Sequence, residues 1–414
     1  MAYQETITTG YGTRVKQSFK KIATGFTLFL SATAMLWWNE GNSVKTADML
    51  VEAQGVCVEM ENPNKKDASL EGQLVCGTAM TATSDLLTDK DFGFSVNAIS
   101  MKRTVEYYQW DEKRTEETKQ KLDGSEKKVV TYDYNLVWSS TPIGSKHFKE
   151  HSTHVNTVLA EFEDGEQWAE HVSFGAYNLN ASLIHGINAY EPLKPDMSDD
   201  MLRVLDRTIQ ATWERQHDKK ADLNSNDYNF VHVSDGQLYL GLDPNNSKVG
   251  DVRITFEKVA PVHEVTVVAV VDGDGFKPFK AKNGYTLEKL VMGKKDIDQF
   301  FEDEQSANTF NTWAYRILGI MMVIGALKLI FGFVVTLARI VPFLSTILGW
   351  GVGVICTVLG FVWSLMVIAI AWLFYRPVIG LTLLVVAGLM IWIFALGGKN
   401  KLKQIATERQ SIKQ

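Results

Sequence analysis

The residues whose types and spacing come nearest to a catalytic arrangement are three histidines, His147, His151 and His154. On a helix this spacing would bring three imidazoles onto one face, where they could bind zinc and activate water for hydrolysis. The segment contains no accompanying cysteine, and a polar surface turn explains the same residues. Both interpretations stay open, and a metal-dependent hydrolase on the outer face is kept as the second alternative function.

Other enzyme motifs are missing from the sequence. His263-Glu264 lacks the second histidine of a zinc-protease helix, and neither a phosphate loop nor a Gly-x-Ser-x-Gly elbow is present. The sequence therefore predicts a protein that is not an enzyme, with no metal and no cofactor.

Cysteine chemistry has few candidates. Cys57 and Cys76 lie in short apolar runs of the central region, and they could form a disulfide if these runs pair as strands in an oxidising compartment. Cys356 lies in an apolar segment, where a thiol most often packs as a small apolar residue.

The elements that must position these residues are set by apolar segments at both ends of the chain. Residues 22–38 carry no charge, and residues 317–396 are apolar apart from Lys328, Arg339 and Arg376. About 20 helical residues cross a bilayer. We predict four transmembrane helices, at 22–38, 317–338, 345–374 and 378–396. A cleaved signal peptide is the alternative for the first one.

Orientation follows from basic residues, which favour the cytoplasmic side of membrane spans. Basic residues gather in the leader, 1–21, and in the tail, 397–414, so both termini are predicted to be cytoplasmic. The region 39–312 is then an extracytoplasmic domain with a formal charge of about −17. Such a charge argues against nucleic acid as a partner.

Polar and small residues inside the predicted spans suggest two further roles. Lys328 would be costly in the bilayer unless it faces protein or water or extends to the interface. The Gly349-x-x-x-Gly353 motif permits close helix packing, within the chain or between two copies.

The central region reads as β-rich. Apolar and polar residues alternate in runs such as 130–138 and 252–257, and Asp235-Gly236 predicts a hairpin turn. Helices are predicted near 168–187, 198–216 and 296–316. The fold class predicted is an α+β membrane protein: one N-terminal span, three C-terminal spans and a large β-rich extracytoplasmic domain between the first and second.

Asn39-Glu40-Gly41, the segment Val249-Gly250-Asp251 and the segment from Trp372 to Pro377 occur in this order along the chain. These segments resemble those of the LUMA family, also known as the transmembrane protein forty-three family. The family-like residues that we single out are Asn39, Glu40, Gly41, Lys45, Gly250, Asp251, Trp372, Arg376 and Pro377. Similarity to this family implies a multispanning protein of the endoplasmic reticulum and inner nuclear membrane in animals, which organises membrane protein complexes. In bacteria, where relatives also occur, the cytoplasmic membrane is expected.

The function expected is a non-enzymatic membrane scaffold. Its partners would be the lipid bilayer, further copies of the chain and other membrane proteins. An oligomeric channel or transporter component that uses Lys328 is the first alternative.

Overall fold

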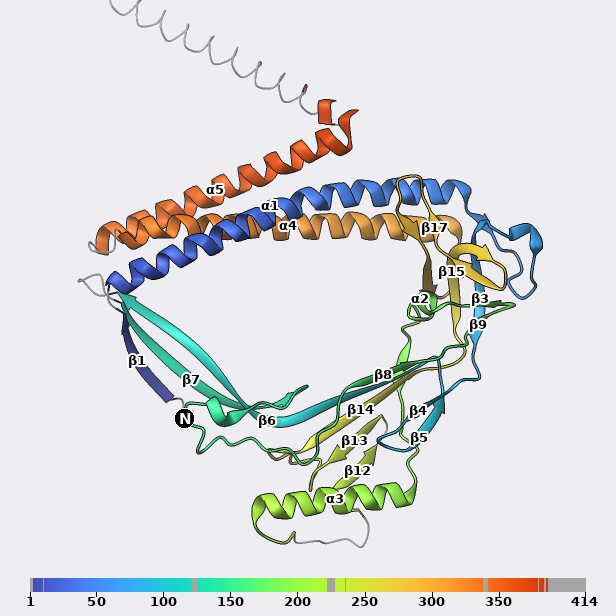
Figure 1. Cartoon of the computed structure of the whole chain (residues 1–414), viewed down its shortest axis with the longest axis horizontal. Helices are drawn as coiled ribbons and strands as arrows, with labels where there is room; N and C mark the ends of the chain where they lie inside the picture. The colour runs from blue at the N-terminus through green and yellow to red at the C-terminus, as the bar shows by residue number, and fades with distance from the viewer. Residues whose placement is uncertain are drawn as a thin grey trace, which may run out of the picture. The chain divides into compact units, whose positions relative to one another are not determined.

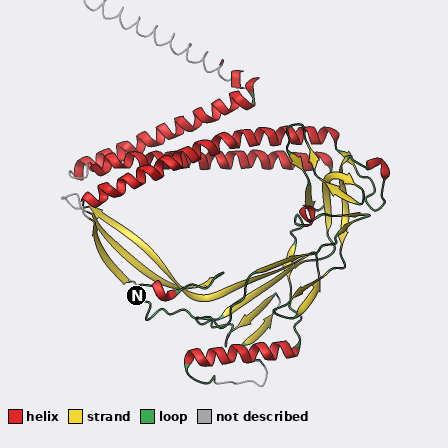
Figure 2. Ribbon diagram, in the orientation of Figure 1, coloured by secondary structure: helices red, strands yellow, loops and turns green. Residues whose placement is uncertain are grey.

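The computed structural model describes residues 3–9, 11–120, 126–221, 228–234, 236–337, 342–378, 380–382 and 385. The chain divides into two compact units. The β-rich unit comprises Met1–Thr8, Met49–Lys119 and Lys127–Glu302, and the helical unit comprises Thr9–Asp48, Gln120–Glu126 and Asp303–Gln414. The chain is thus a mixed α+β protein with a large β-rich part, as predicted (Figure 2).

The helices are α1 (Tyr11–Val56), α2 (Ala181–Ile184), α3 (Asp199–His217), α4 (Ile297–Leu337) and α5 (Pro342–Tyr375), with 3-10 turns at Ala68–Leu70 and Ser145–His147. Helices α1 and α4 each contribute residues to both units. The prediction of a helix at 198–216 is confirmed by α3, where the Ser198 side chain accepts a hydrogen bond from the Met201 amide as an N-cap.

The strands of the β-rich unit form two large sheets and two small ones. One sheet has the order β1-β7-β6-β14-β13-β12, and the other has the order β10-β9-β3-β15-β16. Strands β8 and β11 join the first sheet, and β2 and β19 join the second. Figure 1 labels most of these strands. The bounds are β1 Tyr3–Thr9, β2 Val58–Glu59, β3 Leu74–Ala82, β4 Leu86–Asp89, β5 Phe94–Asn97, β6 Ser100–Gln120, β7 Glu126–Ser139, β8 Gly165–Trp168, β9 Ser173–Phe174, β10 Tyr177–Asn178, β11 Tyr190–Pro192, β12 Val231–Ser234, β13 Gln237–Leu240, β14 Val252–Val259, β15 Glu264–Asp272, β16 Gly275–Lys277, β17 Phe279–Lys280, β18 Thr286–Leu287 and β19 Lys289–Met292.

The hairpin predicted at Asp235-Gly236 is present. Strands β12 and β13 pair antiparallel across a turn at Gly236, whose φ of 72° is the left-handed conformation that glycine adopts without strain. Along β14 the apolar residues Val252, Ile254 and Phe256 are buried, and the residues between them are half-buried. This alternation packs one face of the sheet, together with α3, into an apolar core.

The helix predicted at 168–187 is wrong. Only α2 is helical there, and the preceding residues form the short strands β9 and β10. Phe174, Tyr177 and Leu183 are still buried, in the core beneath β15, so their apolar character was informative although their secondary structure was not. Two short strands and one helical turn bury the same residues that an amphipathic helix would have buried.

Strand β1 was not predicted, because residues 1–21 were expected to be a cytoplasmic leader. It pairs with β7 of the β-rich unit. In addition, Glu5 accepts hydrogen bonds from Tyr132 and Lys149. None of its seven side chains is buried.

In the helical unit, α1 packs antiparallel along the apolar length of α4. Phe19 lies against Phe333 with ring centroids 5.0 Å apart, and Leu36 lies where a Cβ on Gly319 would be 2.5 Å from its Cδ2. Between these two contacts, Ala32 of α1 and Val323 of α4 are buried in the same apolar cluster. Figure 1 shows the two helices side by side.

Helix α5 runs parallel to α1 and antiparallel to α4. The Trp363 indole donates a hydrogen bond to the Thr33 hydroxyl, and the ring centroids of Trp37 and Phe374 are 5.7 Å apart. The contacts therefore follow one another in the same sequence order along both helices. Against α4, a Cβ on Gly360 would be 3.1 Å from the Cα of Ile324. The three helices therefore alternate in direction.

Among the described residues, two helical segments are long and apolar enough to cross a membrane: Ile297–Phe333 and Gly351–Tyr375. They correspond to the second and third predicted spans. The first predicted span lies within α1, and most of the fourth, together with the tail 397–414, lies outside the described residues. Two candidate membrane helices are thus found where four were predicted.

Candidate functional site

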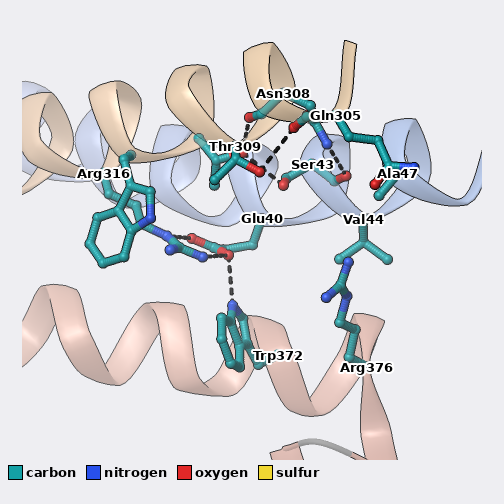
Figure 3. A pocket seen from close by; sticks show the side chains of 12 residues that line it. Glu40, Ser43, Val44, Ala47, Gln305, Asn308, Thr309, Arg316, Trp372 and Arg376 are labelled. Carbon is teal, nitrogen blue, oxygen red and sulfur yellow. Dashed lines mark hydrogen bonds and ion pairs between the residues drawn. The ribbon is translucent and has the colours of Figure 1, made fainter. Parts of the chain in front are cut away.

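Three segments far apart in the sequence meet at a buried carboxylate, that of Glu40 on α1. The Arg316 Nε donates to its Oε1 and the Arg316 Nη2 to its Oε2, each at 2.6 Å. The Trp372 indole Nε1 donates to Oε2 at 2.7 Å (Figure 3). We call Glu40, Arg316 and Trp372 the three-helix junction.

The junction is shielded from water. Glu40 is 1% exposed, and the Arg316 side chain is 12% exposed. The guanidinium also lies over the rings of Trp313 and Trp372, at 4.8 and 5.6 Å from their centroids. A two-pronged Arg–carboxylate pair of this kind is strong only if its remaining hydrogen-bonding capacity is used, and here the indole supplies a third donor.

Hydrogen bonds between α1 and α4 surround the junction. The Asn39 side chain, 3% exposed, donates to the Thr312 carbonyl at 3.1 Å. One turn further along α1, the Asn308 amide donates to the Ser43 carbonyl and the Thr312 hydroxyl contacts the Ser43 hydroxyl. These bonds hold the two helices in one register.

Gly41 allows α5 to approach α1. A Cβ at this position would lie 2.5 Å from Cζ of Tyr375, closer than real atoms come. Asn39, Glu40 and Gly41 therefore each have a distinct contact: α4, both helices and α5. Family-like residues from the two ends of the chain are brought together here.

A pocket of about 250 Å³ opens beside the junction. Its lining includes Ser43, Gln305, Thr309, Arg316 and Arg376. Figure 3 shows the Arg376 guanidinium directed toward α1. Among the described residues, no carboxylate pairs with Arg376.

The three candidate histidines, His147, His151 and His154, do not form a metal site in the described part of the chain. Among the described residues, no group of three or more His, Cys, Asp or Glu side chains could hold a metal. His147 ends a 3-10 turn, and His154 stacks on the Tyr134 ring at 3.9 Å.

Cys57 directly precedes β2, which pairs with β3 at Val75 and Cys76, so the two cysteines of the β-rich unit lie near each other. Both thiols are free in the structure, so the predicted disulfide is not formed there. Burial raises the pKa of Cys57 to about 12 and that of Cys76 to about 11.

The polar and small residues of the spans have open surroundings. Lys328 is exposed on α4, and no carboxylate among the described residues pairs with it. A Cβ on Gly353 would meet no atom within 4 Å. Gly349 is in α5 with its surroundings outside the described side chains, so a packing role for Gly349 and Gly353 stays a prediction.

Gly250 and Asp251 stabilise a turn. Gly250 has a φ of 103°. The buried Asp251 carboxylate accepts hydrogen bonds from the Tyr239 hydroxyl at 2.5 Å and the Lys248 amide at 2.6 Å. Burial raises the pKa of Asp251, because the lost hydration of its charge outweighs the hydrogen bonds from Lys248 and Tyr239.

Sequence reasoning missed Arg316 as a partner of Glu40. The two are separated by 276 positions, so no local pattern connects them. The available signal was positional: Glu40 follows the first apolar segment, Arg316 precedes the second, and Trp372 lies at the end of the third. Lys45 is exposed on α1, and Pro377 directly follows Arg376 beyond the end of α5.

Comparison with known proteins gives consistent matches along the chain. The model of the family described as transmembrane protein 43 matches residues 107–377. Transmembrane protein 43 of Rattus norvegicus is 29% identical over 378 residues, covering 89% of this chain and 88% of the relative. The Homo sapiens protein is 28% identical over 392 residues, covering 92% and 90%.

The transmembrane protein 43 homolog of Drosophila melanogaster is 25% identical over 370 residues, covering 87% of this chain and 90% of the relative. No solved structure matches the chain. The resemblance noted from the sequence is thus confirmed by matches that span most of both chains. This chain belongs to the transmembrane protein 43 family.

Proposed function

We propose that this protein is a non-enzymatic membrane scaffold, which organises membrane protein complexes by self-association and by partner binding through its extracytoplasmic β-rich domain, 39–312. The observation that carries the proposal is the three-helix junction. Both oxygens of Glu40 are occupied by Arg316 and Trp372, so the buried charges hold helices together and leave no free base or nucleophile.

The packing of α1 supports a membrane-crossing first helix. Its residues from Phe19 to Leu36 lie along α4 from Phe333 to Gly319, and a helix packed along a full span reaches the same depths as that span. The junction joins the C-terminal end of the first span, the N-terminal end of the second and the C-terminal end of the third. That arrangement supports three spans that alternate in direction. We propose that 378–396 forms the fourth, which would place both termini in the cytoplasm.

Pairing of β1 with β7 is incompatible with this topology, since a bilayer would then separate the two strands. Of the two, we favour membrane insertion of residues 22–38 over the pairing of β1 with β7. Strand β1 buries no side chain, whereas each Leu, Ile or Phe at the centre of a span favours insertion by roughly 0.3–0.6 kcal/mol. We therefore propose that residues 3–9 do not pair with β7 in the membrane.

Self-association is tested by the mass of the detergent-solubilised particle, measured by light scattering with correction for bound detergent. A scaffold that self-assembles should give a stable multiple of 46.4 kDa. Monomers in every mild detergent and in lipid nanodiscs would overturn self-association.

A matched pair of variants locates the contact. Gly353 has open surroundings in the described part of the chain, whereas Gly360 packs on Ile324. Gly353→Leu should reduce the mass without lowering the thermal midpoint, and Gly360→Leu should lower the midpoint. An unchanged mass with Gly353→Leu would exclude this face as the contact.

An oligomeric channel is the alternative that one observation favours: Lys328 is exposed within an apolar segment of α4. A pore lined by this residue should conduct ions in liposomes, with altered conductance for Lys328→Ala and near-normal conductance for Lys328→Arg. Purified protein that never conducts would exclude the channel.

We propose that the membrane is that of the endoplasmic reticulum and inner nuclear membrane in a eukaryote, or the cytoplasmic membrane in a bacterium.

A further inference from the structure

The pocket beside the three-helix junction lies where apolar helix surface gives way to polar surface. Arg316 directly precedes the apolar residues of α4, and Arg376 follows the last residue of α5. Trp313, 57% exposed, lies on the pocket wall. Tryptophan next to arginine at the end of an apolar helix is typical of the lipid headgroup level.

The charges that line this pocket do not cancel. Glu40, Arg316 and Arg376 are its ionisable side chains. Glu40 and Arg316 neutralise each other through two hydrogen bonds, which leaves the Arg376 guanidinium as an uncompensated cation among the described residues. An anion is the ligand that would remove this imbalance.

Neutral donors complement the cation. The Gln305 side chain lines the pocket and has no hydrogen-bond partner among the described residues, so its amide group can donate. The Ser43 hydroxyl also lines the pocket, whereas the Thr309 hydroxyl already donates to the Gln305 carbonyl. A guanidinium and an amide that line one pocket match the several acceptor oxygens of a phosphate group.

The volume agrees with this ligand class. About 250 Å³ is several times the roughly 30 Å³ that one water occupies in the liquid, so a phosphate ester group fits while acyl chains remain outside. We propose that this pocket binds a phosphate group, carried by an anionic lipid headgroup or present as free phosphate. The proposal depends on the membrane placement of the helices, and it does not depend on self-association.

Binding is measured on the full-length chain in detergent by native mass spectrometry. The chain is titrated separately with dioctanoyl phosphatidic acid, with dioctanoylglycerol, which lacks the phosphate, and with inorganic phosphate. We expect saturable binding of phosphatidic acid and none of dioctanoylglycerol. Additional binding of inorganic phosphate at similar concentrations would identify free phosphate as a sufficient ligand, and its failure to bind would identify the lipid.

The variants test the site. Arg376→Gln should weaken phosphatidic acid binding roughly tenfold or more, as expected for loss of a hydrogen-bonded charge. Arg376→Lys should weaken it less, and Gln305→Leu should weaken it severalfold. Arg207→Gln is the matched control, because Arg207 is exposed on α3 in the β-rich unit, and it should bind as the wild type does.

The thermal midpoint separates lost binding from lost folding. If Arg376→Gln proves unstable, Arg376→Lys and Gln305→Leu decide the question. Binding of phosphatidic acid that is absent in the wild type, or that is equally strong in the folded variants, would overturn the proposal.

Discussion

Replacing Glu40 by Gln removes the charge that the Arg316 guanidinium faces in the three-helix junction. We expect the helical unit to lose roughly 3–5 kcal/mol of unfolding free energy, because an arginine left without its carboxylate in a buried site keeps the cost of its lost hydration. The glutamine keeps the shape of the side chain, so the loss is assigned to charge rather than to a cavity.

The magnitude follows from exposure. The pair is shielded, at 1% exposure for Glu40 and 12% for Arg316, and three donors converge on one carboxylate. The control is the pair Asp272–Lys277 in the β-rich unit, at 54% and 51% exposure. Asp272→Asn should cost less than about 1 kcal/mol, since exposed pairs contribute little.

The assay uses Cys356, a thiol 1% exposed in α5, as a reporter of the helical unit. With Cys57 and Cys76 replaced by Ala, the protein is titrated with sodium dodecyl sulfate in mixed micelles, and alkylation of Cys356 gives the fraction unfolded. The cycle comprises Glu40→Gln, Arg316→Met and the double variant.

We expect each single variant to be strongly destabilised and the double variant to be much less so than the sum. A coupling free energy of at least about 1.5 kcal/mol would support the junction. Additive effects, or a Glu40→Gln variant that is as stable as the Asp272→Asn variant, would contradict this role of the Glu40–Arg316 pair.

Three further outcomes follow from the same contacts. Gly41→Ala should cost roughly 1–3 kcal/mol by overpacking against the Tyr375 ring, and Tyr375→Leu in the same chain should recover part of that loss; full additivity would count against this contact. Burial raises the pKa of Asp251 above 3.8, so its stabilising contribution is complete below that pH and is lost as pH rises through the raised value. The thermal midpoint of the wild type relative to Asp251→Asn should therefore fall with rising pH, and a rise would contradict the assignment. Burial raises the pKa of Cys57 to about 12 and that of Cys76 to about 11, so their alkylation near pH 8 should be at least about tenfold slower in the folded chain than in denaturant, and equal rates would refute their burial.

Local patterns predicted much of the fold because burial has a period. The alternation in β14 and the glycine turn between β12 and β13 are both properties of a few adjacent residues. The helix prediction for 168–187 failed because its apolar residues reach the core from strands of two residues each, which are too short to show a periodic pattern.

The site was only partly predictable. Glu40 and Trp372 could be noted through a family resemblance, but their meeting depends on three helices packing in one register. That register is set by contacts such as Gly319 with Leu36 and Gly360 with Ile324, which connect distant parts of the sequence. The histidine segment shows the converse, because close spacing in sequence did not produce a shared face.

We expect the C-terminal end of α1, the start of the apolar part of α4 and the C-terminal end of α5 to lie on one side of a membrane. The direct measurement is labelling of single cysteines with a membrane-impermeant maleimide in sealed vesicles, in a background without native cysteines. Suitable exposed positions are Ile7, Lys45, Ser306 and Val378. We predict that cysteines at positions 45, 306 and 378 react from the same side and that a cysteine at position 7 reacts only from the other side. Reaction at position 378 from the side opposite to 45 and 306 would contradict the junction, and reaction at position 7 together with the other three would show that α1 does not cross the membrane.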